Sequence, residues 1–238
     1  MKVIIIAGGL GTRIAEETED KPKPMVLIND KPIIWHLMNI FCLQGLNHFI
    51  ISTGYKSEVI ENWVQNNQIL DSNSEKMNIK IINTGLNTQT GGRITEVMKA
   101  LTEEKVIATY GDGLANISIK KLLAFHASHG KLATVTAVRP PARFGYMKIE
   151  NNKVTHFGEK QQSDEGWING GFFVLNSKVV DYVESLHEPF ETGALVKLAN
   201  ESNLMAYHHE GYWQPMDTLR EKRELEKEAS LETPAWLN

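Results

Sequence analysis

The apolar run from Val3 to Ala7, which leads directly into a glycine-rich segment, most constrains how this chain can fold. Its side chains are apolar at every position, whereas a strand with one solvated face would alternate apolar and polar residues. An unbroken apolar strand is covered on both faces, as in a parallel sheet with helices on each side. The first residues therefore predict a parallel sheet between two layers of helices.

Strand-like and helix-like patterns alternate along the rest of the chain. We predict strands at 3–7, 48–52, 79–82, 106–110, 132–138, 171–175 and 204–207, and helices at 32–42, 58–66, 94–101, 119–129, 178–185, 193–201 and 218–228. A hairpin is predicted from 146–150 and 153–157, and a polar loop at 68–77. Right-handed crossovers between such elements give a doubly wound, mostly parallel mixed sheet. We expect one α/β domain, residues 1–238, whose last helix has a solvated face at 220–228.

Composition excludes several classes of function. Of 238 residues, 42% are hydrophobic and 23% charged, as in ordinary soluble proteins. The net charge of −4 argues against a general nucleic-acid binder, and the single cysteine, Cys42, rules out an intramolecular disulfide or a cysteine-rich zinc module. No apolar run approaches the roughly 20 residues of a membrane span, and the start of the chain lacks a signal-peptide pattern. We expect a cytoplasmic protein that binds neither nucleic acid nor membranes.

The segment 7–13, Ala-Gly-Gly-Leu-Gly-Thr-Arg, follows the first strand at the sheet edge where α/β folds bind ligands. Glycines let backbone N–H groups approach phosphate oxygens, and Arg13 adds a planar, permanently charged donor. The segment is not a P-loop, and Ile14 stands where a dinucleotide fingerprint needs glycine, which disfavours a dehydrogenase. The alternative is a simple glycine turn between strand and helix.

Lys23 lies between Pro22 and Pro24, which hold the backbone around it extended. A lysine–proline repeat alone is typical of a surface loop. A fixed lysine about ten residues behind a glycine loop that ends in Arg13 is a more specific pattern. Together they predict a binding site for a polyphosphate.

In this order, these motifs resemble the sugar-1-phosphate nucleotidyltransferase family. The form of 21–26, with Trp35-His36 behind it, is similar to the cytidylyltransferases of that family. The likeness continues in five later segments, 90–93, 109–113, 143–145, 168–174 and 212–218. It implies a Rossmann-like nucleotidyltransferase fold with a small sugar-binding hairpin. It also implies an enzyme that uses Mg²⁺ to transfer a cytidylyl group from CTP to α-D-glucose 1-phosphate.

The resemblance assigns roles to individual residues. Asp112 and Asp217 are the expected Mg²⁺ ligands, and Arg13 and Lys23 the expected catalytic cations. Nucleotide contacts are implied for Ala7, Gly8, Gly9, Leu10, Gly11, Thr12, Arg13, Lys23, Thr88, Arg93 and Gly111. Sugar-phosphate contacts are implied for Gly145, Glu159, Lys160 and Asn169.

Each assignment has a structural alternative. Asp112 could be a turn residue, and Asp217 could cap the last helix. Arg93 could face solvent, and Glu159 and Lys160 could form a plain ion pair at the end of the hairpin.

Three functional alternatives also stand. The same fold could use UTP or dTTP, or another sugar 1-phosphate or a non-sugar phosphomonoester, or the chain could be a non-catalytic regulator. The expected partners are CTP and a sugar 1-phosphate. The protein could also form a homo-oligomer.

Overall fold

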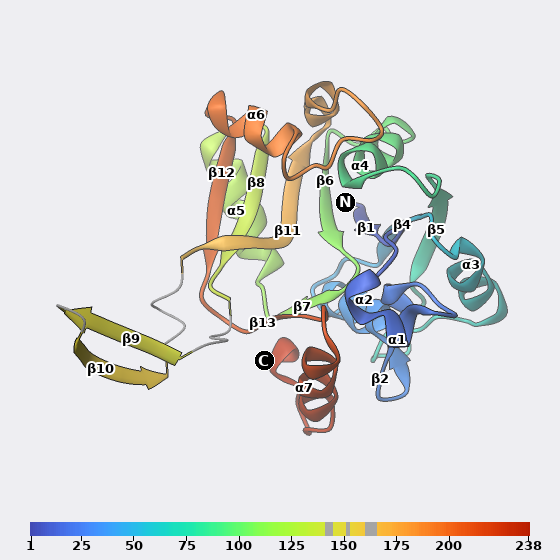
Figure 1. Ribbon diagram of the computed structural model, residues 1–238. Helices are drawn as coiled ribbons and strands as arrows, with labels where there is room; N and C mark the ends of the chain where they lie inside the picture. The colour runs from blue at the N-terminus through green and yellow to red at the C-terminus, as the bar shows by residue number, and fades with distance from the viewer. Residues whose placement is uncertain (141–144, 151–152, 160–165) are drawn as a thin grey trace.

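A seven-stranded sheet forms the centre of the protein (Figure 1). The computed structural model describes residues 1–140, 145–150, 153–159 and 166–238. The strands, in chain order, are β1 (Val3–Ile6), β4 (His48–Thr53), β5 (Asn78–Asn83), β6 (Lys105–Tyr110), β8 (Ala133–Val138), β11 (Ile168–Asn176) and β12 (Leu204–His209). Across the sheet they lie in the order β12-β8-β11-β6-β1-β4-β5. Only β11 is antiparallel to its neighbours, so the predicted mostly parallel mixed sheet is confirmed.

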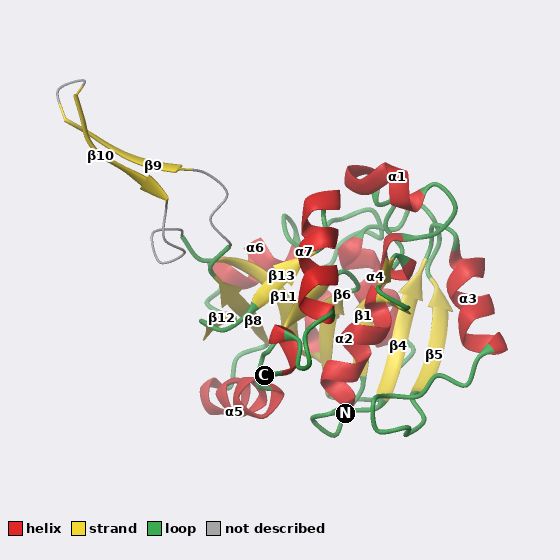
Figure 2. Ribbon diagram, turned by 90° about the horizontal axis from the view of Figure 1, so that it is seen from below, coloured by secondary structure: helices red, strands yellow, loops and turns green. Residues whose placement is uncertain are grey.

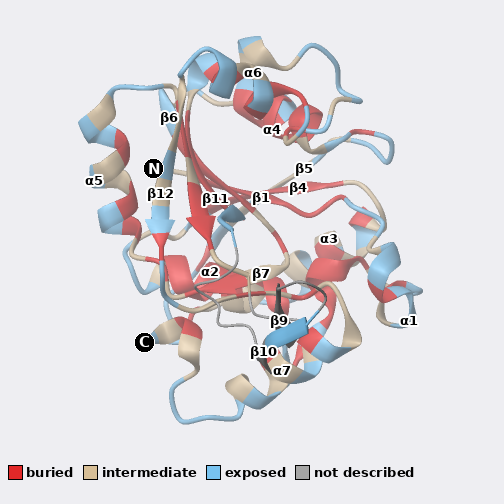
Figure 3. Cartoon of the chain, turned by 60° about the vertical axis from the view of Figure 1, so that its left-hand side comes forward, coloured by how far each residue is buried: buried red, intermediate tan, exposed pale blue. Residues whose placement is uncertain are grey.

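Helices cover both faces of this sheet (Figure 2). The helices of the structure are α1 (Ala15–Thr18), α2 (Ile33–Cys42), α3 (Ser57–Asn66), α4 (Thr90–Lys99), α5 (Ile119–His129), α6 (Ala194–Asn200) and α7 (Leu219–Ala229). Val3 and Ile5 of β1 pack into the core on the side of α2, while Ile4 and Ile6 pack into a second core on the side of α4. Buried residues therefore line β1 on both sides, as its unbroken apolar sequence predicts (Figure 3).

Two predicted helices differ from the structure. The helix predicted at 94–101 begins at Thr90, because Gly91 and Gly92 are helical and lie against the backbone of 186–190. A Cβ on Gly92 would lie 2.3 Å from the carbonyl oxygen of Leu186, so glycine is needed for this close approach. The helix predicted at 178–185 is instead a 3-10 segment, η4 (Ser177–Tyr182).

The predicted polar loop at 68–77 is closed by local contacts. Leu70 and Lys76 form an isolated bridge, and the Asp71 carboxylate accepts hydrogen bonds from the backbone N–H groups of Asn73 and Glu75.

Several short elements were not predicted. β2 (Leu27–Ile28) pairs with β3 (Lys31–Pro32), and β7 (Gly113–Ala115) pairs with β13 (Trp213–Pro215). Three further 3-10 segments are η1 (Thr12–Ile14), η2 (Lys23–Met25) and η5 (Ala235–Leu237). Within the described residues, no helix is both long and apolar enough to cross a bilayer.

The predicted hairpin is present as β9 (Gly145–Glu150) and β10 (Lys153–Glu159). Its two strands are antiparallel, and Gly145 pairs with Glu159 at the end nearest the sheet. Figures 1 and 2 show the hairpin projecting away from the body of the sheet.

Candidate active site

A cavity of about 900 Å³ opens at the carboxyl ends of β1 and β6. The two strands are parallel neighbours with Ile6 opposite Tyr110, so the segments that follow them emerge at the same edge of the sheet. Segment 8–13 after β1 and segment 111–113 after β6 both line the cavity. The cavity therefore lies where open α/β sheets bind ligands.

The glycine loop after β1 is held close to Lys23. Gly11 has a left-handed backbone with φ of 67°, and a Cβ there would lie 3.3 Å from the Cβ of Lys23. The Thr18 hydroxyl donates to the carbonyl oxygens of Gly11 and Ile14, each at 3.2 Å. Glycine thus allows the loop to turn tightly over the lysine that the sequence singled out.

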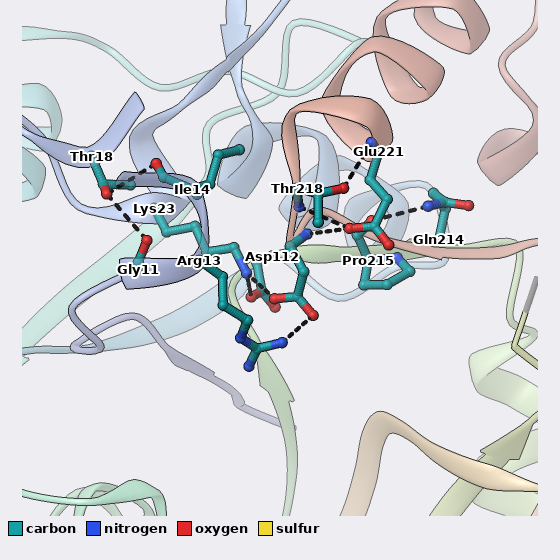
Figure 4. A network of polar contacts seen from close by, with 11 residues as sticks. Gly11, Arg13, Ile14, Thr18, Lys23, Asp112, Gln214, Pro215, Thr218 and Glu221 are labelled. Carbon is teal, nitrogen blue, oxygen red and sulfur yellow. Dashed lines mark hydrogen bonds and ion pairs between the residues drawn. The ribbon is translucent and has the colours of Figure 1, made fainter. Parts of the chain in front are cut away.

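Lys23 is buried at the cavity floor with 8% of its surface exposed. Its Nζ donates to one carboxylate oxygen of Asp112 and one of Asp217, both at 2.6 Å (Figure 4). Burial alone would lower the pKa of this ammonium, but the charges and hydrogen bonds of the two carboxylates outweigh burial and raise it. Lys23 is therefore a charged group held between two carboxylates.

The ribbon of β7 and β13 brings the two aspartates together. Gly113 pairs with Pro215, and the backbone N–H of Met216 donates to the carbonyl oxygen of Asp112 at 2.9 Å. Asp217, the next residue, also accepts a hydrogen bond from Arg13 at 2.5 Å. Arg13, Lys23, Asp112 and Asp217 thus meet at one point although they lie far apart in the sequence.

Glu221 frees Asp217 from capping the last helix. Thr218 is the N-cap of α7, and its side chain accepts from the backbone N–H of Glu221. The Glu221 carboxylate accepts in return from the backbone N–H groups of Asp217 at 2.7 Å and Thr218 at 2.9 Å. Because this capping box satisfies the helix end, the Asp217 side chain is free to face the cavity.

The prediction of a solvated helix face at 220–228 is wrong for Glu221, which is only 6% exposed. The Thr218-x-x-Glu221 spacing is the sequence signal that could have identified it.

Arg93 is buried behind the glycine loop instead of facing solvent. It is 3% exposed, and its guanidinium donates to the carbonyl oxygens of Gly8 at 2.9 Å and Thr53 at 2.7 Å. It also donates to the Thr84 hydroxyl at 2.7 Å. Burial lowers the pKa of this arginine. Arg93 and Thr88 both line the cavity, and Arg93 ties the loop to the end of β4.

The cavity wall also presents neutral polar groups and one further carboxylate. Asn169 donates to the Tyr110 hydroxyl at 3.0 Å, and that hydroxyl donates to Glu191. Glu191 also accepts from the Thr90 hydroxyl at 2.7 Å. Burial, followed by the charge of Glu191, raises the pKa of the Tyr110 phenol, so the phenol stays protonated. Among these residues only Asn169 was assigned to the site from the sequence.

A family model for nucleotidyl transferases matches residues 2–223. The chain belongs to the nucleotidyl transferase family. It is 43% identical to the glucose-1-phosphate cytidylyltransferase of Salmonella typhi and 40% identical to the probable glucose-1-phosphate cytidylyltransferase of Bacillus subtilis, each over 95% of both chains. Among solved structures, it is similar to HddC from Yersinia pseudotuberculosis complexed with GMP-PN, with a TM-score of 0.72, 25% identity, and coverage of 96% of this chain and 99% of that one.

Some of the sugar-phosphate contacts expected for this nucleotidyltransferase belong to the hairpin. Gly145 begins β9 and Glu159 ends β10, and the two residues pair with each other. Lys160 lies outside the described residues. Asn169, another expected sugar-phosphate contact, lines the same cavity as Asp112.

The chemistry of the two aspartates fits a divalent metal ion. No group of three or more metal-ligating side chains occurs in the part of the chain that the structure describes. Mg²⁺ usually keeps several waters, however, and needs only one or two protein carboxylates. Asp112 and Asp217 supply hard oxygen ligands that already converge on one cationic atom, Nζ of Lys23.

Proposed function

We propose that the protein transfers a cytidylyl group from CTP to α-D-glucose 1-phosphate, giving CDP-glucose and pyrophosphate. The observation that carries this proposal is the convergence of Arg13, Lys23, Asp112 and Asp217 beside the glycine loop in one cavity. The choice of CTP and glucose 1-phosphate is supported by relatives of that name that are 43% and 40% identical.

The reaction needs charge neutralisation more than proton transfer. A phosphate oxygen of the sugar phosphate forms a bond to the α-phosphorus of CTP, and the bond from that phosphorus to pyrophosphate breaks. A phosphate monoester, with a second pKa of about 6, is largely dianionic at neutral pH, so the nucleophile requires no general base. Repulsion between the two anions is the main barrier, and fixed cations lower it.

Different residues of the cavity neutralise the charge of different groups. The backbone N–H groups of 8–12 and the Arg13 guanidinium bind the triphosphate, while buried Lys23 neutralises the charge that builds up around the α-phosphorus. Asp112 and Asp217 hold Mg²⁺, which when bound supplies further positive charge and orients the phosphates.

The remaining predicted residues bind the two substrates on either side of the reacting phosphates. Thr88, Arg93 and Gly111 line the nucleotide side of the cavity, Arg93 by fixing the position of Gly8. Asn169 contacts the sugar, and Gly145, Glu159 and Lys160 serve the sugar phosphate from the hairpin.

A substrate panel tests this function. CTP, UTP and dTTP are each combined with glucose 1-phosphate, other sugar 1-phosphates and a non-sugar phosphomonoester, and pyrophosphate release is measured. The proposal predicts the highest kcat/KM for CTP with glucose 1-phosphate. A higher value for another pair would overturn the substrate assignment, and no release with any pair would overturn the enzymatic one.

A further inference from the structure

The phosphate-binding cations and the metal-binding carboxylates are paired with each other in this structure. Nζ of Lys23 lies 2.6 Å from an oxygen of Asp112 and 2.6 Å from an oxygen of Asp217. Arg13 lies 2.5 Å from the second oxygen of Asp217. The four side chains that the proposed reaction assigns to the triphosphate and the metal therefore already have partners inside the protein.

Lys23 occupies the point at which a metal ion would bind. Both carboxylates direct an oxygen at its ammonium group, and the lysine side chain is only 11% exposed. Mg²⁺ contacts its oxygen ligands at about 2.0–2.1 Å, so a metal bound to both oxygens would lie next to this ammonium. Two cations in that space would repel each other.

The backbone around Lys23 cannot move far with its side chain. Lys23 begins the short 3-10 segment η2, and Pro24 follows it. Pro24 also packs close to Gly111, where a Cβ would lie 3.0 Å from the proline ring. A change of partner must therefore come from rotation about the four side-chain bonds of the lysine.

We infer that Lys23 is an internal substitute for the metal ion: it neutralises Asp112 and Asp217 until metal and triphosphate arrive, and then turns to the triphosphate. This inference rests on the proposed function for the identity of the two ligands. Metal alone must displace the ammonium into a cavity without an anion. Nucleotide alone must draw the Lys23 ammonium away, which leaves Asp112 and Asp217 without a counter-charge beside the triphosphate.

Metal and nucleotide therefore promote each other's binding. When both are present, the carboxylates pair with the metal and the cations pair with the phosphates, so no charge is left without a partner. The coupling is reciprocal, and couplings of this kind amount to about 5- to 150-fold in affinity.

The test is metal binding in the absence of any nucleotide. Free Mn²⁺ is followed by electron paramagnetic resonance during titration of the wild-type protein, Lys23→Gln and a matched control, Lys21→Gln. Lys21 belongs to the same segment, but its ion pair is with exposed Asp20. We expect Lys23→Gln to bind Mn²⁺ about 5- to 150-fold more tightly than wild type, and Lys21→Gln to match wild type. Equal or weaker binding by Lys23→Gln would overturn the inference.

A second variant tests where the tighter Mn²⁺ binding of Lys23→Gln occurs. Adding Asp112→Asn to Lys23→Gln should abolish the tighter binding, and retention of it would place the ion elsewhere and overturn the inference. A crystal of the wild-type protein soaked in MnCl₂ gives an independent result should Lys23→Gln not fold. We expect Nζ of Lys23 to leave both carboxylates when Mn²⁺ is bound, and Mn²⁺ on both aspartates beside an unmoved lysine would contradict the exchange.

These outcomes are separate from those of the substrate panel. Transfer from CTP with no gain of metal affinity in Lys23→Gln would leave the function standing and remove the exchange. A gain of metal affinity in Lys23→Gln without any transfer from CTP would remove the proposed function and leave the exchange standing.

Discussion

Replacing Glu221 by alanine should raise the metal concentration that the enzyme needs and lower its stability. Glu221 is not among the described residues that line the cavity, but its carboxylate accepts hydrogen bonds from the backbone of Asp217 at 2.7 Å and of Thr218 at 2.9 Å. Glu221→Ala removes both bonds and leaves the Asp217 backbone free to shift. We therefore regard Glu221 as a positioning residue for the expected metal ligand.

The size of both effects follows from these two bonds. Losing a helix cap costs about 1 kcal/mol of stability, and the half-buried N–H groups left without a partner add a similar amount. Loss of a group that orients a metal ligand typically lowers metal affinity about 10- to 100-fold. Glu221→Gln keeps an amide oxygen that can accept the same bonds, so it should recover most of both losses.

Urea unfolding measures the first effect, and the metal concentration for half-maximal turnover measures the second. Ser118→Ala is the matched control, because Ser118 caps the equally long α5 by accepting from the backbone N–H of Lys121 and does not line the cavity. Both alanine variants should lose stability, but only Glu221→Ala should need more metal. An unchanged metal requirement in Glu221→Ala would refute the positioning role.

Three further predictions concern the body of the protein. Burial raises the pKa of the Cys42 thiol to about 12, so iodoacetamide should alkylate the native protein much more slowly than the urea-unfolded one, and equal rates would contradict this. Burial also lowers the pKa of His126 from 6.5 to about 4, so the unfolded state binds more protons between these values and the free energy of unfolding should fall as the pH drops through them. His126→Gln should flatten this fall in urea titrations, and an unaltered slope would exclude His126 as its source. Gly171 has φ of 85° and a Cβ there would lie 2.5 Å from the Tyr110 ring, so Gly171→Ala should destabilise by about 1–3 kcal/mol, while Gly166→Ala, in open space, should not.

The central sheet could be predicted from the sequence because its signal is local. The run from Val3 to Ala7 is apolar at every position, and β1 is buried on both faces in the structure. The glycine loop could also be predicted, because backbone freedom depends on residue type alone. The extended backbone predicted from the prolines on either side of Lys23 is wrong, because the 3-10 segment η2 begins at this residue.

The ribbon that assembles the site could not be predicted in the same way. β7 and β13 each have three residues, too few for a periodic pattern, and the pairing of Gly113 with Pro215 joins distant parts of the chain. Without that pairing nothing in the sequence itself places Asp112 beside Asp217. Gly91 and Gly92 misled the helix prediction for a similar reason, because the contact that requires glycine there comes from segment 186–190.

Pyrophosphate release from CTP and glucose 1-phosphate by Asp112→Asn tests the central claim most directly. Asp20→Asn, which alters an exposed aspartate in the same protein, is the control, and thermal unfolding verifies that both variants fold. A metal ion contributes several kcal/mol to phosphoryl chemistry, and 1.36 kcal/mol is tenfold in rate, so the account predicts a fall in kcat of about 100-fold or more for Asp112→Asn alone. Release by folded Asp112→Asn at close to the wild-type rate would contradict it.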